Sequence, residues 1–291
     1  MCRNKAERDP LPDDMALTRN TIIALGNQLA PAVATYSRMR VLLSDPESEL
    51  DEVIKLIRLD PALTFHVVRL SNSVIFGLRE PTDCLDVAVG RVGFEELFRL
   101  VGLAATRHVC QRDLLTYRLK ASRMWENAVA TAAAAELLAE RAERDAGLAY
   151  SAGLLRMIGR VVIDGAATGN VYPGEAEWPV LAEWEKRTFG ITSAEVTTEL
   201  LAHWRFPAEL VEMVRSHFEP LADPNRSNAG ACQLNLACGV VARFGLDLPG
   251  ETGDWDCTAA KLTLAGLSEA DLEECAERAR RHFALLCASI A

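Results

Sequence analysis

The stretch Leu59–Gly77, LDPALTFHVVRLSNSVIFG, places the tightest limit on what this chain can fold into. Its dipeptide Asp60-Pro61 predicts the start of a helix, because the carboxylate can accept from the free amide groups of a first turn. Proline is tolerated at the first helical position, since its missing amide would have no partner there. The apolar residues that follow recur at helical spacing: Leu63, Val67 and Leu70. A short helix is therefore predicted to begin at this proline.

The same stretch indicates where that helix ends and what precedes it. Asn72 and Ser73 have short polar side chains that bind backbone groups at helix ends, and Gly77 is a helix breaker. We expect Asn72 to cap the last carbonyl groups of the helix. Upstream, a second apolar stripe repeats with the helical period: Leu50, Val53, Ile54 and Ile57. Two helices are therefore predicted to meet in a tight corner at residue 60.

The rest of the chain shows the same helical period, with no alternating strand pattern of useful length and no internal repeat. Helices are predicted over 17–43 with an interruption near Pro31, 85–92 closed by Gly93, 94–110, 116–144, 149–163, 180–188 and 193–204. Phe206 and Pro207 begin another that reaches His217, and three more are expected beyond residue 233. The predicted fold class is all-α.

Composition narrows the class of protein. Of the 291 residues, 49% are hydrophobic, which is ample for a buried core. The 31 basic residues against 41 acidic ones give a net charge of −10, which disfavours a dedicated nucleic-acid binder. No apolar run approaches the roughly 20 residues that span a bilayer, and residues 1–16 form a polar leader without the apolar centre of a signal peptide. We expect a soluble cytoplasmic protein that binds neither nucleic acid nor membrane.

Familiar catalytic and metal-binding motifs are missing from the sequence. It contains no GxSxG, GxxxxGK[ST] or HExxH, and no GxGxxG after a strand. Its eight cysteines form no CxxC pair. We therefore expect reduced and mostly buried thiols rather than a zinc site.

The motifs do resemble those of one family. DPAL at 60–63, a short apolar helix, Asn72-Ser73 and an aromatic residue before Gly77 are similar to the HDOD domain family of bacterial signalling proteins. A second cluster follows in the same order: Trp125, GLLRMIGR at 153–160, FGI at 189–191 and His217. Gly93, Gly153 and Gly159 are structural glycines of these motifs.

The resemblance covers about residues 17–218 and implies how the chain is divided. It implies an HDOD domain of two helical lobes, an N-terminal one at 17–112 and a degenerate HD-like one at 113–218. Residues 219–291 would be a C-terminal helical extension. The stretch Glu219–Gly230, rich in Pro, Asn and Gly, is the best candidate for the boundary.

The segment GLLRMIGR is also similar to the GLLHDIGK helix of HD-type metal-dependent phosphohydrolases, whose His and Asp ligands hold a divalent ion. Here Arg156 and Met157 stand in place of that His-Asp pair. A guanidinium cannot ligate a cation, and a thioether is a poor ligand for a hard ion. The resemblance matches Asn127 and Ser193 to further histidines of the pattern and leaves His217 as the surviving one. We therefore expect hydrolase chemistry and its metal to be lost, and no cofactor.

Arg156, Asn127 and His217 are then the candidate ligand-binding residues. The guanidinium of Arg156 can bind an anionic group, such as a nucleotide phosphate, where the metal would be. The alternative is an internal ion pair with one of the many acids, for example Glu126 or Glu195. For His217 the alternative is a helix-end histidine bonded to a backbone carbonyl.

The resemblance implies a non-enzymatic signal-transduction or regulatory protein. It would bind a signalling protein, or a nucleotide second messenger, at a surface or cleft between the lobes. Two other functions stay open: a residual phosphohydrolase of the HD type, and a non-catalytic sensor of nucleotide second messengers. Metal analysis tests the first, and calorimetry with cyclic dinucleotides and guanosine polyphosphates tests the second.

Overall fold

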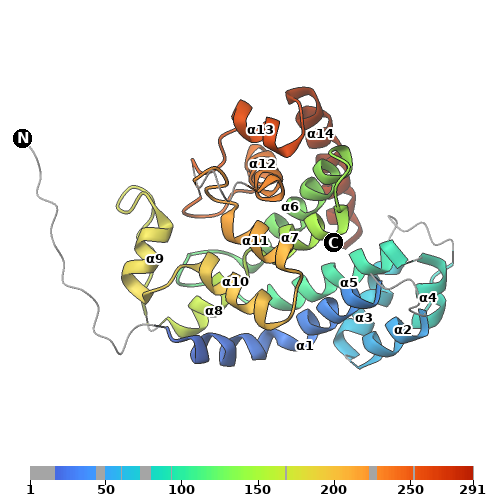
Figure 1. Cartoon of the computed structure of the whole chain (residues 1–291). Coiled ribbons are helices and arrows are strands. Elements are labelled where there is room, and N and C mark those ends of the chain that lie inside the picture. Colours follow the sequence, from blue (N-terminus) through green and yellow to red (C-terminus); the bar gives the residue numbers. More distant parts are fainter. Residues whose placement is uncertain are drawn as a thin grey trace, which may run out of the picture.

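A computed structural model of the protein describes residues 17–43, 50–59, 61–72, 80–92, 94–167, 169–222, 228–251 and 253–290. In this part of the chain there are fourteen helices and no strand, and Leu114 and Leu119 form only an isolated antiparallel bridge. The prediction of an all-α fold is therefore confirmed (Figure 1).

The N-terminal helices are α1 (Arg19–Leu43), α2 (Leu50–Arg58), α3 (Pro61–Ser71), α4 (Leu85–Val92) and α5 (Phe94–Val109). As predicted, α3 begins at Pro61. The other residues of these motifs, Asp60, Ser73, Gly77 and Gly93, lie outside the described residues.

Helix α1 runs through Pro31 without interruption, so the break predicted there is wrong. A proline inside a helix costs about 3 kcal/mol. Packing of α1 against α5 and α10 offsets this cost, because Val33, Tyr36 and Met39 beyond the proline are fully buried. The ring of Tyr36 stacks on Phe98 of α5, with 4.6 Å between the ring centroids.

Asn72 ties the end of α3 to the segment before α4. Its side-chain nitrogen donates to the carbonyl of Thr82 at 2.8 Å, and its side-chain oxygen accepts from the amide of the same residue at 3.0 Å. The predicted capping of α3 by this side chain is therefore wrong, since both bonds reach forward along the chain. The paired contact instead fixes how α3 leads into α4.

The expected second lobe, whose boundaries stay a prediction, contains the alanine-rich helix α6 (Ala121–Arg141), followed by α7 (Ala146–Leu155), α8 (Ile158–Ala166), α9 (Leu181–Phe189), α10 (Ser193–His203) and α11 (Ala208–Ser216). Helix α7 lies close against α6 because Gly153 has no side chain: a Cβ there would be 2.6 Å from the backbone of Ala132. The single helix predicted over 149–163 is in fact two, α7 and α8, separated at Arg156 and Met157.

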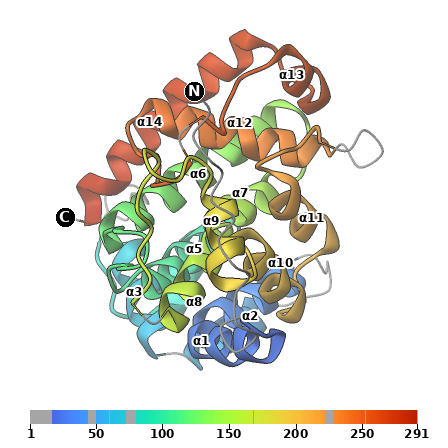
Figure 2. The same ribbon diagram turned by 90° about the vertical axis from the view of Figure 1, so that its left-hand side faces the viewer.

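Helices α12 (Ala229–Arg243), α13 (Ala259–Ala265) and α14 (Glu269–Ile290) lie on the side of the molecule away from α1–α3 (Figures 1 and 2). Both α12 and α14 pack against α6. As a result, nearly every residue of α6 from Met124 to Ala139 is buried. The division at residue 219 stays a prediction, but helices on both sides of it contribute to one hydrophobic core.

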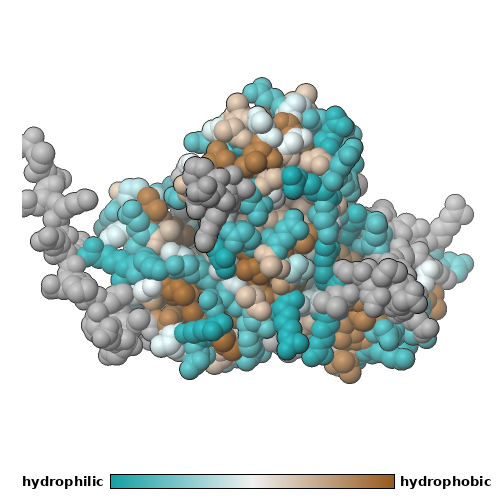
Figure 3. Space-filling model, in the orientation of Figure 1, coloured by the Kyte–Doolittle hydropathy of each residue, from teal (hydrophilic) through white to brown (hydrophobic). Residues whose placement is uncertain are grey.

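The segment Ala146–Ala166 is long and apolar enough to cross a membrane, but 89% of its apolar window is buried inside the protein. Buried core helices of globular proteins can have the same length and apolar content. The apolar content of this segment is explained by the packing of α7 against α6 and of α8 against α10. On the face shown in Figure 3, apolar residues form separate patches bordered by polar ones.

The six cysteines whose side chains the structure describes are free thiols. Four of them are buried: Cys110, Cys232, Cys238 and Cys275. Cys84 and Cys257 are exposed. Burial raises the pKa of both Cys110 and Cys238 to about 12, so these two thiols behave as small apolar side chains.

Candidate functional site

The turn between α7 and α8 holds Arg156 in the interior of the second lobe. Arg156 ends α7, and Met157 precedes α8. Thr197 of α10 contacts both sides of this break: its hydroxyl accepts from the amide of Gly159 at 2.9 Å and lies 3.1 Å from the carbonyl of Arg156. A Cβ at position 159 would be 1.9 Å from the carbonyl oxygen of Ser193. Only glycine therefore lets α8 and α10 approach this closely.

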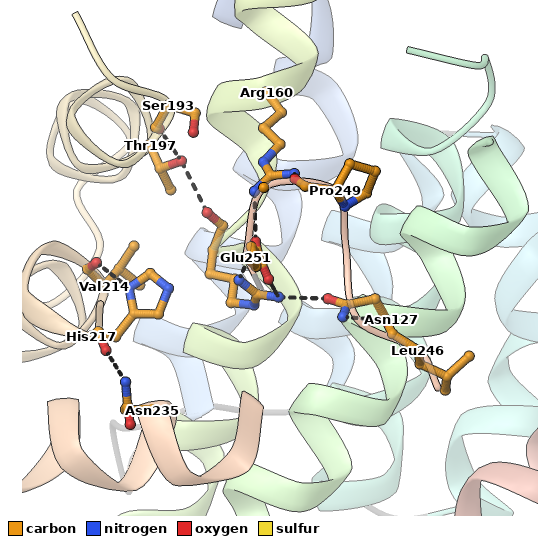
Figure 4. A network of polar contacts seen from close by, with 12 residues as sticks. Asn127, Arg160, Ser193, Thr197, Val214, His217, Asn235, Leu246, Pro249 and Glu251 are labelled. Carbon is orange, nitrogen blue, oxygen red and sulfur yellow. Dashed lines mark hydrogen bonds and ion pairs between the residues drawn. The ribbon is translucent and has the colours of Figure 1, made fainter. Parts of the chain in front are cut away.

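Arg156 forms a buried ion pair with Glu251, which lies between α12 and α13 and is labelled in Figure 4. Its Nη1 and Nη2 contact Oε1 and Oε2 of Glu251, each at 3.1 Å, and Nη2 also donates to Oδ1 of Asn127 at 2.8 Å. Arg160, on α8, donates to Oε1 of the same carboxylate at 2.7 Å and to the carbonyl of Pro249 at 2.9 Å. The side chains of this Arg156–Glu251–Arg160 network are at most 1% exposed.

The segment that carries Glu251 is fixed to the second lobe by further hydrogen bonds. Asn127 of α6 donates to the carbonyl of Leu246 at 2.8 Å, and Arg123 donates to the carbonyl of Gly245 at 2.6 Å. The amide of Gly250 donates to Glu175 at 3.0 Å. The carboxylate therefore enters the lobe on a well-anchored piece of backbone rather than on a free loop.

The network holds more positive than negative charge. Burial raises the pKa of Glu251, but the guanidinium groups of Arg156 and Arg160 outweigh this effect and keep that pKa below its usual range. One ionised carboxylate thus neutralises two buried cations only in part. A second buried acid, Glu185 of α9, accepts from the hydroxyl of Tyr117 at 2.8 Å and from the amide of Ser193 at 2.7 Å. Burial raises its pKa, although Arg160 opposes the shift.

His217 lies directly after α11, beside the network. Its Nδ1 donates to the carbonyl of Val214 at 2.7 Å, so the neutral ring carries its lone pair on Nε2. Burial, together with the positive charge of Arg156, lowers the pKa of His217 to about 3. The rings of Phe218 and Trp255 lie 4.2 and 5.9 Å from it, measured between centroids. His217 is therefore a neutral helix-end histidine bonded to a backbone carbonyl, the alternative expected from the sequence.

The structure brings the three candidate residues together. Arg156 bonds to Asn127, and it shares the ring of Trp255 with His217: the guanidinium carbon lies 5.5 Å from the indole centroid. All three side chains are buried. A ligand that reached Arg156 would have to displace Glu251, so a role for these residues in anion binding stays a prediction.

The internal ion pair proposed for Arg156 is present, but its acid is Glu251 rather than Glu126 or Glu195. Glu251 lies in a turn region rich in Gly, Pro and Asp, outside every motif and helical stripe of the sequence. One signal does point to it. Arg156 and Arg160 are four residues apart in an apolar segment, and two buried cations require a buried acid. The sequence does not show which of its 41 acidic residues supplies that charge.

These residues do not fit the divalent ion that HD-type phosphohydrolases hold. The guanidinium groups of Arg156 and Arg160 would repel a cation, and the carboxylate between them is already bonded to both. His217 offers a lone pair on Nε2, but one nitrogen is fewer than the three protein ligands that a metal site needs. Within the described ranges, no group of three or more His, Cys, Asp or Glu side chains is placed to hold a metal.

A cleft of about 450 Å³ adjoins the network, between α9, α10, α11 and the segment after α12. Ser193, which the resemblance matched to a histidine of the hydrolase pattern, lines it, and so does Phe218, the neighbour of His217. The charged groups of the cleft are mainly acidic: Glu185, Glu212, Glu219 and Asp254 against Arg215. Burial raises the pKa of Asp254 to about 6. Such a lining does not suit an anionic nucleotide.

The fold and the site together define a class of protein: an all-helical protein with two arginines and a glutamate buried in one ion-pair network. Comparison with known families agrees. The model of the HDOD domain matches residues 29–220, well over half of the chain, and the chain belongs to the HDOD domain family. The family suggested by the sequence motifs is therefore confirmed.

Solved structures support the same fold. An HDOD domain protein with unknown function from Geobacter sulfurreducens has a TM-score of 0.63 and 21% identity, covering 97% of this chain and 93% of that one. A "Putative signal transduction protein" from Marinobacter aquaeolei VT8 has a TM-score of 0.67 and 23% identity, covering 87% and 57%. For a "Putative phosphohydrolase" from Shewanella amazonensis SB2B the values are 0.65 and 24%, covering 91% and 96%. At these identities the likeness concerns the fold alone.

An uncharacterised protein of Treponema pallidum (strain Nichols) is 26% identical over 191 residues, which are 60% of this chain and 34% of that protein. The chain thus spans about a third of the length of this relative.

Proposed function

We propose that this HDOD protein is a regulatory component of bacterial signal transduction, which acts by binding and does not hydrolyse phosphoesters. The Arg156–Glu251–Arg160 network carries the proposal. It puts the guanidinium of Arg156 at a position that the resemblance assigns to a metal ligand, and the carboxylate of Glu251 that pairs with it is bonded to Arg160 as well.

The energy of the network favours this reading. A metal ion would have to displace the guanidinium of Arg156, and Glu251 would have to release at least one cation. Separating one partner from a buried ion pair costs about 3–5 kcal/mol. Arg160 would remain beside the incoming ion, since its own hydrogen bond to Pro249 holds it on that side of the lobe. The filled form is therefore the stable one.

Binding would use the surface of the protein, because the network itself is sealed. Besides the acidic cleft, a groove of about 810 Å³ lies between α1, α2 and the end of α10. The two lobes meet at this groove: the hydroxyl of Ser37 on α1 donates to the carbonyl of Trp204 after α10 at 2.8 Å. A partner in the groove would touch both lobes at once, which suits a protein that passes on a signal by a shift between them.

The cytoplasm is the proposed location. Reduced thiols support it, because Cys84 and Cys257 are exposed without a disulfide partner and thiols of this kind persist in reducing compartments.

The test of the proposal is a combined measurement of metal content and turnover. The full chain, purified without chelators, is analysed by plasma mass spectrometry and assayed with bis-p-nitrophenyl phosphate and cyclic dinucleotides in the presence of Mn²⁺, Mg²⁺ or Fe²⁺. We expect substoichiometric metal and no turnover above that of a His217→Phe variant, which keeps an aromatic ring in the stack. A stoichiometric ion, with turnover that this variant loses, would show a hydrolase instead.

Native mass spectrometry of the chain isolated from its own cells then identifies what it binds. We expect a protein partner. A bound nucleotide without a protein partner, confirmed by calorimetry with cyclic dinucleotides and guanosine polyphosphates, would favour the sensor function instead.

A further inference from the structure

The groove between the lobes has one wall from each of three elements. Helix α1 contributes Arg38, helix α2 contributes Lys55, and the turn after α10 contributes Arg205. Figures 1 and 2 both show α10 beside α1, and α2 packs against α1 as well. All three cationic side chains are exposed. The groove is thus rimmed by positive charge on a protein whose net charge is −10.

Within the described ranges these three cations have no ion-pair partner. Most other described arginine and lysine side chains form ion pairs, for example Arg19 with Glu199 and Lys186 with Glu195. Arg38, Lys55 and Arg205 form none with any residue in the described part of the chain. Glu52 is the one acidic residue among the described residues that line the groove. Among the described residues that line the groove, three cations therefore stand against one acid.

Arg205 stands where the backbone favours glycine. Its φ of 60° lies in the left-handed region, and the turn closes α10 with two hydrogen bonds, from the amide of Arg205 to Ala202 and from that of Phe206 to Leu201. At the equivalent positions α9 and α13 end in glycine, Gly190 and Gly266, each with a φ of 75°. An arginine at this position costs stability that a glycine would not.

Between the charged rims, the walls of the groove are apolar. Leu56 and Trp204 form buried parts of it, and Leu59 at the end of α2 is 75% exposed. A phosphate site gathers its donors around one point, whereas these cations stand on three separate elements around an apolar floor. An extended or helical peptide with apolar side chains between carboxylates matches this arrangement better than a nucleotide.

We propose that the groove between the lobes binds an acidic segment of a partner protein, with apolar side chains on the floor and carboxylates against Arg38, Lys55 and Arg205. This rests on the proposed function, because it names the surface and the chemistry by which the protein would recognise its partner. Binding that uses both lobes would also couple the partner to their relative position.

The test uses a phage library of random 16-residue peptides, selected on the full chain. Two variants with the same change in net charge are compared: R38E/K55E/R205E in the groove, and R69E/R118E/R144E elsewhere on the surface. The second set also consists of exposed cations for which no ion pair occurs within the described ranges. We expect selected peptides to combine Asp or Glu with Leu, Ile, Met or Phe. Their affinity should fall at least about tenfold in the groove variant and less than about threefold in the control.

A single substitution separates charge from folding. Arg205→Gly should raise the urea concentration at the midpoint of unfolding and still lower the affinity for the selected peptides. Damage to the fold would lower both the midpoint and the affinity. Peptides without acidic residues, or peptides that bind both triple variants alike, would overturn the groove as the site. A cyclic dinucleotide or guanosine polyphosphate whose binding is lost only in the groove variant would overturn the peptide as its occupant. Neither result bears on whether the protein hydrolyses phosphoesters, because the metal and turnover assays decide that question independently.

Discussion

Replacing Glu251 by Gln should destabilise the protein strongly, because it removes a carboxylate that is bonded to two buried arginines. The side chain of Glu251 is fully buried and accepts from Arg156 at 3.1 Å and from Arg160 at 2.7 Å. Leaving a buried charge without its partner costs about 3–5 kcal/mol. We expect the free energy of unfolding to fall by about 4 kcal/mol. This is a large part of the roughly 5–15 kcal/mol by which most native proteins are stable.

The complementary change sharpens this prediction. Arg156→Met leaves Glu251 still paired with Arg160 and removes the surplus cation, so we expect a loss of only about 1–2 kcal/mol, from the hydrogen bond to Asn127 and the packing of the guanidinium. The measurement is urea unfolding followed by circular dichroism at 222 nm, with the slope checked for two-state behaviour. Glu273→Gln, which breaks an exposed pair with Arg243, is the control and should cost less than about 1 kcal/mol. If Glu251→Gln costs no more than this control, or less than Arg156→Met, the account of the network is wrong.

Three further predictions concern other parts of the structure. The pKa of His217 is lowered from about 6.5 to about 3, so the folded protein binds fewer protons than the unfolded chain between these pH values and loses stability as the pH falls through that window. His217→Phe should therefore flatten the dependence of the urea midpoint on pH between 6.5 and 3, and an unchanged slope would contradict the assigned burial. Gly159→Ala should cost about 2 kcal/mol or more in the same unfolding assay, because its Cβ meets the backbone of α10, while Gly90→Ala in α4 has open space and should be neutral or stabilising by up to about 1 kcal/mol. In the native protein a thiol reagent should modify Cys84 and Cys257 before any other described cysteine, and replacing both by Ser should remove this fast phase.

Much of the fold could be predicted because its elements follow local rules. The helical period and the proline at the start of α3 are properties of short stretches of sequence. The failures occurred where tertiary contacts outweigh local preference. Helix α1 continues through Pro31 because its buried side chains pack against α5 and α10. Helix α7 ends at Arg156, although the sequence beyond it remains apolar with a helical period.

The site could be predicted only in part, for a related reason. Motif spacing brought Arg156, Asn127 and His217 to attention, and the structure places them together. Motif spacing did not indicate Glu251, which lies 95 residues from Arg156 in a segment without helical periodicity. The groove was equally hidden, since its cations belong to separate elements and each one alone resembles an ordinary surface residue.

The position of Glu251 has a consequence for how this protein can be divided. A fragment that ended at residue 220, where the family match stops, would keep every motif by which the family is recognised. It would nevertheless lose the counter-ion of two interior arginines and the helices that shield α6 from water. The stretch that the family model matches thus lacks contacts on which the interior depends, and we expect a change at position 251 to be tolerated only when positions 156 and 160 change with it.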